Sequence, residues 1–301
     1  MYAYFGHHKC ATRWIRGILG RIAAENGWQS KEVNMAELDT QNALPALADN
    51  IRNKKDFLLI SQASVYKAVP ELPGLKGLHV FRDPRDILVS GYYSHLKVHR
   101  TNNWPSLREF RNKLQSISKE AGLIEEIKFS RFTYVPLQEW QTNNPNIYEL
   151  KMEELTARPY YYFRQVFEFW GVFQETTNGS LANTEKDING EAVAQTPQRV
   201  TAYWNRALNR AVRRNKLTLA NQLKLPYRKV TAGQLKRVLE MHRFEKLAKG
   251  RKKGQEDTSS HYRKGKAGDW QNHFTPPVKE AFKQAYGDLL IKFGYENDHN
   301  W

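Results

Sequence analysis

The sequence is poor in cysteine, in acidic residues and in long apolar segments. Cys10 is the single cysteine among 301 residues, which excludes an intrachain disulfide framework and any metal site built from several cysteines. We therefore expect no metal, and a chain that is stable in a reducing compartment. The strand-like N-terminus carries no apolar region of the length that a signal peptide or a membrane span requires. These absences predict a cytoplasmic protein without a membrane span.

Basic residues outnumber acidic ones by 47 to 31, which gives a formal net charge of +16. Such an excess favours an anionic partner, although a basic surface that keeps a protein soluble produces the same count. Hydrophobic residues make up 40% of the chain, enough to bury a substantial core. We predict a single domain over residues 1–301.

Short apolar runs alternate with segments of helical periodicity. The runs at 2–5, 57–60, 78–81 and 147–152 are bounded by polar or turn residues, as buried parallel strands are. Helical spacing follows the first run from Thr12, the third from Pro84 and the fourth from Pro159, and it returns in the tail at 276–293. This alternation predicts an α/β fold with three layers, in which helices cover a central parallel sheet.

Two long segments do not fit the alternation. Residues 191–247 are strongly basic and have a helical pattern without a strand-like run, which predicts a mostly helical insertion over the sheet. Residues 249–263 are polar and lack periodicity, which is typical of a mobile loop.

The segment GHHKCATRW, residues 6–14, falls at a predicted strand-to-helix turn. Such a turn directs backbone N–H groups and the positive end of the helix dipole at one point, which suits a phosphate or sulfate group. Lys9 adds a mobile charge and Thr12 adds a hydroxyl donor. The Walker A pattern needs a second glycine and a lysine directly before the hydroxyl residue, and their absence argues against a nucleotide kinase. An ordinary turn capped by Thr12 is the alternative.

The segment FRDPRDILVS, residues 81–90, begins at the end of the third predicted strand. Arg82 and Ser90 lie about two helical turns apart, and they converge on a second phosphate only if the helix packs alongside. The simpler explanation for the charged residues that follow Arg82 is that Asp83 caps this helix and that Arg85 and Asp86 are surface charges.

A third anion-binding candidate is YRKG, residues 262–265. Two adjacent cations, Arg263 and Lys264, precede Gly265 in a flexible loop. A loop of this kind can close over an anion and bring its backbone N–H groups close.

Taken together and in this order, FGHHKCATRWI, FRDPRDILVSGYYSH and HYRKGKAGDWQNHFT resemble the three cofactor-binding segments of the sulfotransferases that use 3'-phosphoadenosine 5'-phosphosulfate (PAPS). The segments span the chain from residue 6 to residue 275. The resemblance implies a fold similar to that of P-loop NTPases. It also implies transfer of a sulfuryl group from PAPS to a hydroxyl or amine acceptor, with release of adenosine 3',5'-bisphosphate.

The resemblance also implies a role for individual residues. Lys9 would be catalytic, because it would contact the phosphosulfate and stabilise the leaving phosphate. The cofactor-binding residues that it implies are Cys10, Ala11, Thr12, Arg13, Trp14, Arg82, Ser90, Phe244, Arg263, Lys264 and Gly265. Trp14 and Phe244 would lie near the adenine, and the 3'-phosphate would be held by residues of the second and third segments.

The chain departs from the family where the general base is expected. The cytosolic branch has a histidine just after the second strand, where this chain reads LISQAS at 59–64. Carbohydrate-modifying relatives use a glutamate after the first helix, for which Glu32 and Glu37 are rough equivalents. His95 and His99 are further candidates, and the base stays open.

The segment after the fourth strand departs as well. The Tyr-Glu-Asp sequence that is common in the family appears here as Met152-Glu153-Glu154. We therefore do not predict the tyrosine contact to the nucleotide base, and we expect the two glutamates to be structural.

The acceptor, a small molecule or a carbohydrate, also stays open. A rival interpretation is a nucleic-acid or polyanion binding protein that uses residues 199–237, where Tyr203, Trp204 and Tyr227 could stack on bases. A solvated helical face explains this segment more simply, so we do not expect a nucleic-acid partner. An ATP-dependent kinase would need a magnesium site, which we do not find in the sequence.

Overall fold

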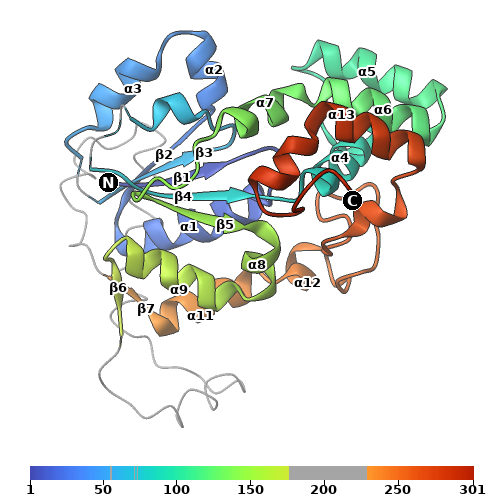
Figure 1. The fold of residues 1–301 in the computed structure, drawn as a ribbon. Helices are drawn as coiled ribbons and strands as arrows, with labels where there is room; N and C mark the ends of the chain where they lie inside the picture. Colours follow the sequence, from blue (N-terminus) through green and yellow to red (C-terminus); the bar gives the residue numbers. More distant parts are fainter. Residues whose placement is uncertain (55, 71, 73, 176–228) are drawn as a thin grey trace.

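A computed structural model describes residues 1–54, 56–70, 72, 74–175 and 229–301. Five strands form one sheet in the order β2-β3-β1-β4-β5 (Figure 1). They are β1 Tyr2–Gly6, β2 Gln29–Val33, β3 Phe57–Ser61, β4 Lys76–Phe81 and β5 Ile147–Lys151. Every neighbouring pair runs parallel. The predicted α/β fold with a central parallel sheet is therefore confirmed.

Alternation along the strands assigns each side chain to one of two faces. On β1, Tyr4 packs with the apolar stripes of α1 (Thr12–Asn26), α9 (Pro159–Phe169) and α11 (Ala232–Met241). Ala3 and Phe5 point the other way, toward α2 (Met35–Thr40) and α3 (Leu44–Ile51). Helices thus lie on both faces of the sheet, as Figure 1 shows.

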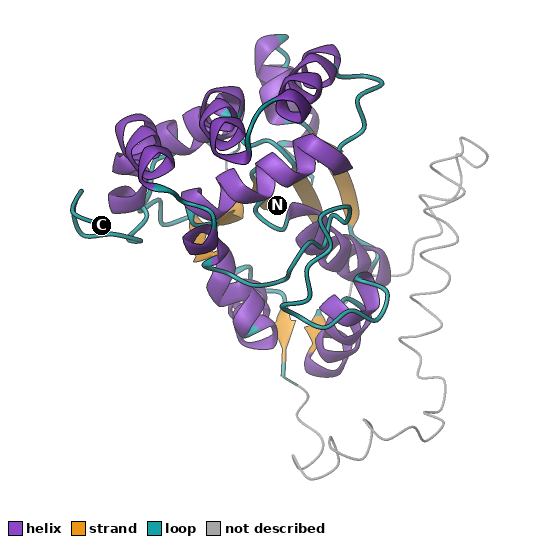
Figure 2. Cartoon of the chain, turned by 90° about the vertical axis from the view of Figure 1, so that its right-hand side faces the viewer, coloured by secondary structure: helices purple, strands orange, loops and turns teal. Residues whose placement is uncertain are grey.

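A second group of helices lies beyond the ends of the strands in Figure 1, on the side that Figure 2 turns toward the viewer, and their apolar side chains form a core of their own. It contains α4 Pro84–Tyr93, α5 Pro105–Ser116, α6 Lys119–Phe129, α7 Arg131–Glu139 and α13 Pro276–Lys292. Asp83 caps α4 by accepting from the N–H of Arg85 at 2.9 Å, as the sequence predicts. Helix α4 continues into one turn of π-helix, η2 (Ser94–Val98).

Short elements connect these layers. They are the 3₁₀ helices η1 Tyr66–Ala68 and η6 Asp269–Asn272, the helices α8 Met152–Ala157 and α12 Phe244–Leu247, and the strands β6 Phe173–Gln174 and β7 Val230–Thr231. None of the helices in the described ranges is both long enough and apolar enough to cross a membrane.

Two elements differ from the sequence-based expectation. Strand β2 was not predicted, because four of its five residues are exposed at the sheet edge and show no apolar run. Strand β7 falls within the segment expected to lack strands. The N–H of Val230 donates to the carbonyl of Val172, and β7 pairs in parallel with β6.

Most of the basic segment at 191–247 lies outside the described residues. Its described part, residues 229–247, consists of β7, α11 and α12. Residues 249–263 contain no helix or strand. Arg251 ties this segment together by donating to the carbonyls of Gln255, Tyr262 and Arg263. Its mobility stays a prediction.

Candidate functional site

A cavity of about 1740 Å³ lies at the carboxyl ends of the strands and is lined by residues from all three anion-binding segments. The lining includes eleven of the predicted site residues: Lys9, Ala11, Thr12, Arg13, Trp14, Arg82, Ser90, Phe244, Arg263, Lys264 and Gly265. Cys10 is the exception, because its side chain is fully buried in the second helical core. The structure thus gathers residues more than 250 positions apart around one space.

The loop between β1 and α1 has a specific backbone shape. Lys9 and Ala11 adopt left-handed conformations, with φ of 66° and 54°, which are uncommon for non-glycine residues. The hydroxyl of Thr12 donates to the carbonyl of His7 at 2.8 Å, and the N–H of Cys10 donates to the same oxygen at 3.2 Å. At Gly6 a Cβ atom would lie 2.6 Å from the Tyr4 hydroxyl, so this position requires glycine.

Lys9 presents an unpaired cation to the cavity. Within the described part of the chain, no carboxylate forms an ion pair with its ammonium group. Burial, and then the positive charge of Arg82, lower the pKa of Lys9 to about 7. An anion bound here would restore the charge that this environment disfavours.

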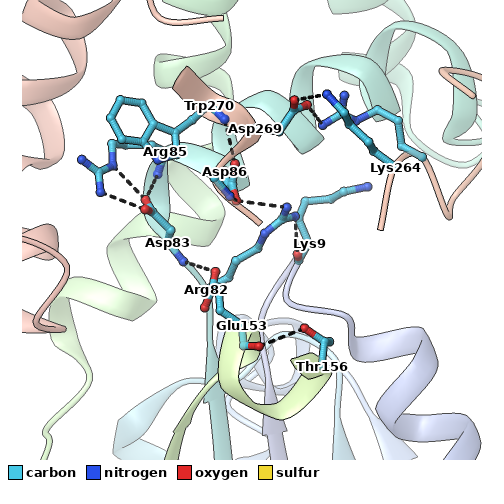
Figure 3. A network of polar contacts seen from close by, with 12 residues as sticks. Lys9, Arg82, Asp83, Arg85, Asp86, Glu153, Thr156, Lys264, Asp269 and Trp270 are labelled. Carbon is cyan, nitrogen blue, oxygen red and sulfur yellow. Dashed lines mark hydrogen bonds and ion pairs between the residues drawn. The ribbon is translucent and has the colours of Figure 1, made fainter. Parts of the chain in front are cut away.

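Arg82 lies at the end of β4 and joins the first two segments (Figure 3). One guanidinium nitrogen donates to the carbonyl of Lys9 at 3.2 Å, and another lies 3.6 Å from a carboxylate oxygen of Asp86. Its Nε atom is buried and has no partner among the described residues. Ser90, two turns along α4, lines the same cavity as Arg82, and their convergence on one phosphate stays a prediction.

The third segment is fastened to α4 by Asp86. The expectation that Arg85 and Asp86 are surface charges is wrong, because both are buried and paired within the protein. The carboxylate of Asp86 accepts from the backbone N–H groups of Gly268 at 2.8 Å and Trp270 at 2.9 Å. Asp269 in turn forms ion pairs with both Arg263 and Lys264 (Figure 3). The two cations expected to bind phosphate are therefore already held in place by a carboxylate of their own segment.

Gly265 makes a close approach that only glycine allows. Its φ is 65°, and a Cβ atom would lie 2.6 Å from the ring of Phe244. Phe244, on α12, lines the cavity next to this backbone. Trp14 lines it as well, and its indole N–H donates to the carbonyl of His242 at 2.9 Å, which fixes the ring.

The model of the sulfotransferase domain family matches residues 6–204 and 219–294. This chain belongs to the sulfotransferase family. The predicted resemblance is confirmed, and with it the assignment of the chain as an enzyme of the transferase class.

Solved structures of sulfotransferases are similar at low identity. Mouse sulfotransferase SULT7A1 complexed with PAP is 13% identical, with a TM-score of 0.45, and the match covers 96% of this chain and 84% of that one. Retinol dehydratase in complex with androsterone and the inactive cofactor PAP is also 13% identical, with a TM-score of 0.43 and coverage of 96% and 80%. A search of curated proteins found no match.

The candidate bases of this sulfotransferase are placed very differently. Glu32 and Glu37 line a separate hollow of about 390 Å³, away from Lys9, and Glu32 pairs with Arg16 at 3.2 Å. His99 lines the main cavity, and His95 is buried directly behind it.

Glu153 also lies close to the site, but its contacts are to the protein. It accepts from the N–H of Asp83 at 3.0 Å and from the hydroxyl of Tyr295 at 2.8 Å. These contacts fit the structural role that we expect for Glu153.

Sequence reasoning named His95 and His99 as candidate bases, but it did not predict the two histidine groups that the structure brings together near the site. In the first group, His8, His95 and His99 have ring nitrogens within 4.8 Å of one another. This spacing fits metal coordination, but the positive charge of Lys9 beside the histidines opposes the binding of a cation. In the second group, His7 contacts His79 at 2.9 Å, and His79 contacts Glu149 at 2.5 Å. His79 and Glu149 come from β4 and β5, and no local sequence signal links them to His7.

Proposed function

We propose that this sulfotransferase moves the sulfuryl group of PAPS to a hydroxyl or amine acceptor and releases adenosine 3',5'-bisphosphate. The observation that carries the proposal is the convergence of three separate cation-bearing segments on one cavity beside the β1–α1 loop. A donor with phosphate groups at both its 5' and 3' positions needs anion sites on opposite sides of a nucleoside. Lys9 lies in the β1–α1 loop, and Arg82, Ser90, Arg263 and Lys264 form the second group of anion-binding candidates.

Sulfuryl transfer resembles phosphoryl transfer, an in-line displacement in which catalysis is mostly positioning and electrostatic stabilisation. In this reaction the acceptor oxygen or nitrogen bonds to sulfur while the bond from sulfur to the bridging oxygen breaks. The electron pair stays with the departing 5'-phosphate. The ammonium of Lys9 would stabilise that developing charge, and a base in the cavity would take the acceptor's proton.

The roles of the remaining residues belong to the same proposal. Arg82 and Ser90, joined by Arg263, Lys264 and Gly265, would hold the 3'-phosphate, and Trp14 and Phe244 would enclose the adenine. Ala11, Thr12 and Arg13 would contact the 5' side. For Cys10 the contribution would come from its place in the loop backbone, since its thiol faces the core. The acceptor that we propose is a small molecule or a carbohydrate.

Calorimetric titration with adenosine 3',5'-bisphosphate, with ATP as the control, tests the proposal. We expect tight binding of the bisphosphate and weak binding of ATP, because only the bisphosphate carries a 3'-phosphate. Equal affinity for the two nucleotides would contradict the assignment of the second and third segments.

A further inference from the structure

The histidine group beside Lys9 contains a buried carboxylate–imidazole pair. Nδ1 of His95 lies 2.9 and 3.0 Å from the two carboxylate oxygens of Glu126, and both side chains are completely buried. The hydroxyl of Ser130 also donates to Glu126. A carboxylate bound at Nδ1 fixes the tautomer of an imidazole and leaves the lone pair on Nε2, as in triad hydrolases.

Nε2 of His95 has no hydrogen-bond partner among the residues that the structure describes, although it is buried. Nε2 of His8 is likewise buried without a partner, and the rings of His8 and His95 stack with an interplanar angle of 4°. Buried polar nitrogens without partners are rare, which points to a ligand that they share. His8 and His99 line the cavity, and the ring centroid of His95 lies 5.3 Å from that of His8 and 5.7 Å from that of His99.

The spacing of the three rings fits a single oxygen atom. One nitrogen atom from each ring lies within 4.8 Å of the others. If one oxygen atom forms hydrogen bonds of about 2.8 Å to two such nitrogens, and the N···O···N angle is tetrahedral, the two nitrogens lie about 4.6 Å apart. A hydroxyl of the acceptor therefore fits between these histidines, next to Lys9.

The backbone of this region is built to hold the histidines in place. His95 lies on the π-helix η2, a rare element that is frequent at functional sites. Arg111 on α5 donates to the carbonyl of His95 at 2.7 Å and to the carbonyl of His99 at 2.6 Å. The guanidinium thus fixes both ends of the short segment that carries them.

We propose that His8, His95 and His99 bind the attacking hydroxyl of the acceptor, and that His95 is the general base, positioned by Glu126. The inference rests on the proposed function. As the acceptor oxygen bonds to sulfur, its proton passes to Nε2 of His95, and the 5'-phosphate leaves with the electron pair of the broken bond. The resulting imidazolium is stabilised by Glu126, and its proton returns to solvent through His99 after the sulfated product leaves.

The surroundings of His8 and His99 favour neutral imidazoles before substrate binds. Glu126 faces His95 from α6, His8 and Lys9 face it from the β1–α1 loop, and Arg111 and His261 lie nearby on α5 and in the 249–263 segment. Burial, and then Lys9, lower the pKa of His99 to about 3 and lower that of His8 well below its usual range. Neutral rings can accept or donate a hydrogen bond to a hydroxyl.

The His7–His79–Glu149 group provides a matched control. It has the same contact between a glutamate and a histidine, but both nitrogens of His79 are already occupied, one by Glu149 and the other by His7. His79 therefore has no nitrogen left for a substrate. Glu149→Gln removes a comparable hydrogen bond without touching the proposed base.

The kinetic test uses radiolabelled PAPS with 2-naphthol as the acceptor probe, and it compares Glu126→Gln, His95→Gln and Glu149→Gln. We expect His95→Gln to lower kcat/KM by about 10²-fold or more and Glu126→Gln by about tenfold, with affinity for adenosine 3',5'-bisphosphate unchanged. The acidic limb of the pH profile should move to lower pH in Glu126→Gln, because the imidazolium loses its carboxylate. Glu149→Gln should match the wild type.

A second measurement reads the tautomer directly and needs no acceptor. In a nitrogen-15 spectrum of the histidine side chains with bound bisphosphate, His95 should carry its proton on Nδ1 near neutral pH. A proton on Nε2 instead would overturn the proposal. A rate loss in Glu149→Gln but not in Glu126→Gln would also overturn the proposal, because it would assign the base to His7. Loss of activity on addition of a metal chelator would overturn it as well. Failure of the wild-type protein to bind the bisphosphate would instead refute the proposed function.

Discussion

The ammonium of Lys9 combines a functional position with an unfavourable environment. It lies in a left-handed backbone conformation, points into a cavity and has no carboxylate partner in the described ranges. Replacing it with methionine should lower turnover roughly 10²- to 10³-fold, because the leaving oxygen would lose the ammonium group that stabilises its developing charge. Measurement of kcat with saturating PAPS tests this, and Lys128→Met, at an exposed position on α6, is the control. Near-normal turnover would remove Lys9 from the mechanism.

The same substitution should raise stability. In the unfolded chain Lys9 keeps its ordinary pKa near 10.4, whereas burial and Arg82 lower it to about 7 in the folded protein. Between these values the unfolded state binds more protons, so the contribution of Lys9 to the free energy of unfolding rises with pH and is least favourable below pH 7. Lys9→Met should therefore raise Tm by about 2 °C or more at pH 6, and by less at pH 10.

Arg82 should act on binding more than on rate. Its guanidinium already contacts the carbonyl of Lys9, and its Nε has no partner in the described part of the chain, so donors remain for a phosphate. Arg82→Ala should weaken binding of adenosine 3',5'-bisphosphate at least tenfold, since charge-assisted hydrogen bonds contribute about 1.5–3 kcal/mol. Titration of the variant with the bisphosphate measures this. Unchanged affinity would contradict the assignment of Arg82 to the 3'-phosphate.

Among the elements, the segment that follows residue 249 depends on α4 for its position. Asp86 accepts two backbone N–H groups from it, and Asp269 within it holds Arg263 and Lys264. Asp86→Ala should therefore release the segment while leaving the sheet intact. We expect faster amide exchange at 262–272 and a loss of bisphosphate affinity of about tenfold. Asp288→Ala, at an exposed position on α13, is the control, and unchanged exchange at 262–272 would show that other contacts suffice.

The elements that the sequence predicted are those with a buried apolar pattern. The runs that became β1, β3 and β4 are apolar because parallel central strands are covered on both faces. Strand β5 lies at one edge of the sheet, but Ile147 and Leu150 are buried and kept its apolar pattern visible. Edge strand β2 escaped prediction because its sequence, QSKEV, is polar. Cap signals were reliable too, since Asp83 and Pro84 begin α4 where expected.

The residues of the candidate site also fall into those that the sequence could predict and those that it could not. Lys9, Arg82 and Arg263 each belong to a short contiguous segment, so a motif could identify them. The pair of His95 and Glu126 joins α4's extension to α6, and the pair of His79 and Glu149 depends on strand register. Such contacts arise from packing between elements, and a single sequence carries no signal for them.

For the whole molecule, the net charge of +16 and the basic residues that line the cavity both attract an anionic nucleotide. The cavity lining contains only two glutamates, and lysines and arginines greatly outnumber them. The basic residues of the lining are Lys9, Arg13, Arg16, Arg82, Lys236, Arg237, Arg243, Lys253, Arg263, Lys264 and Lys266. A field of one sign attracts a polyanionic nucleotide from a distance, and added salt screens it. The Kd of adenosine 3',5'-bisphosphate should therefore rise about tenfold between roughly 50 and 500 mM potassium chloride.

Adenosine, which lacks both phosphates, is the control for this measurement. Its weaker binding should be nearly independent of salt, because only contacts to the uncharged nucleoside remain. If the bisphosphate also binds independently of salt, its phosphates are held by short-range hydrogen bonds alone, and the basic character of the molecule has no part in cofactor capture. A salt dependence confined to the bisphosphate would show that the positive field of the whole protein contributes to binding at this one site.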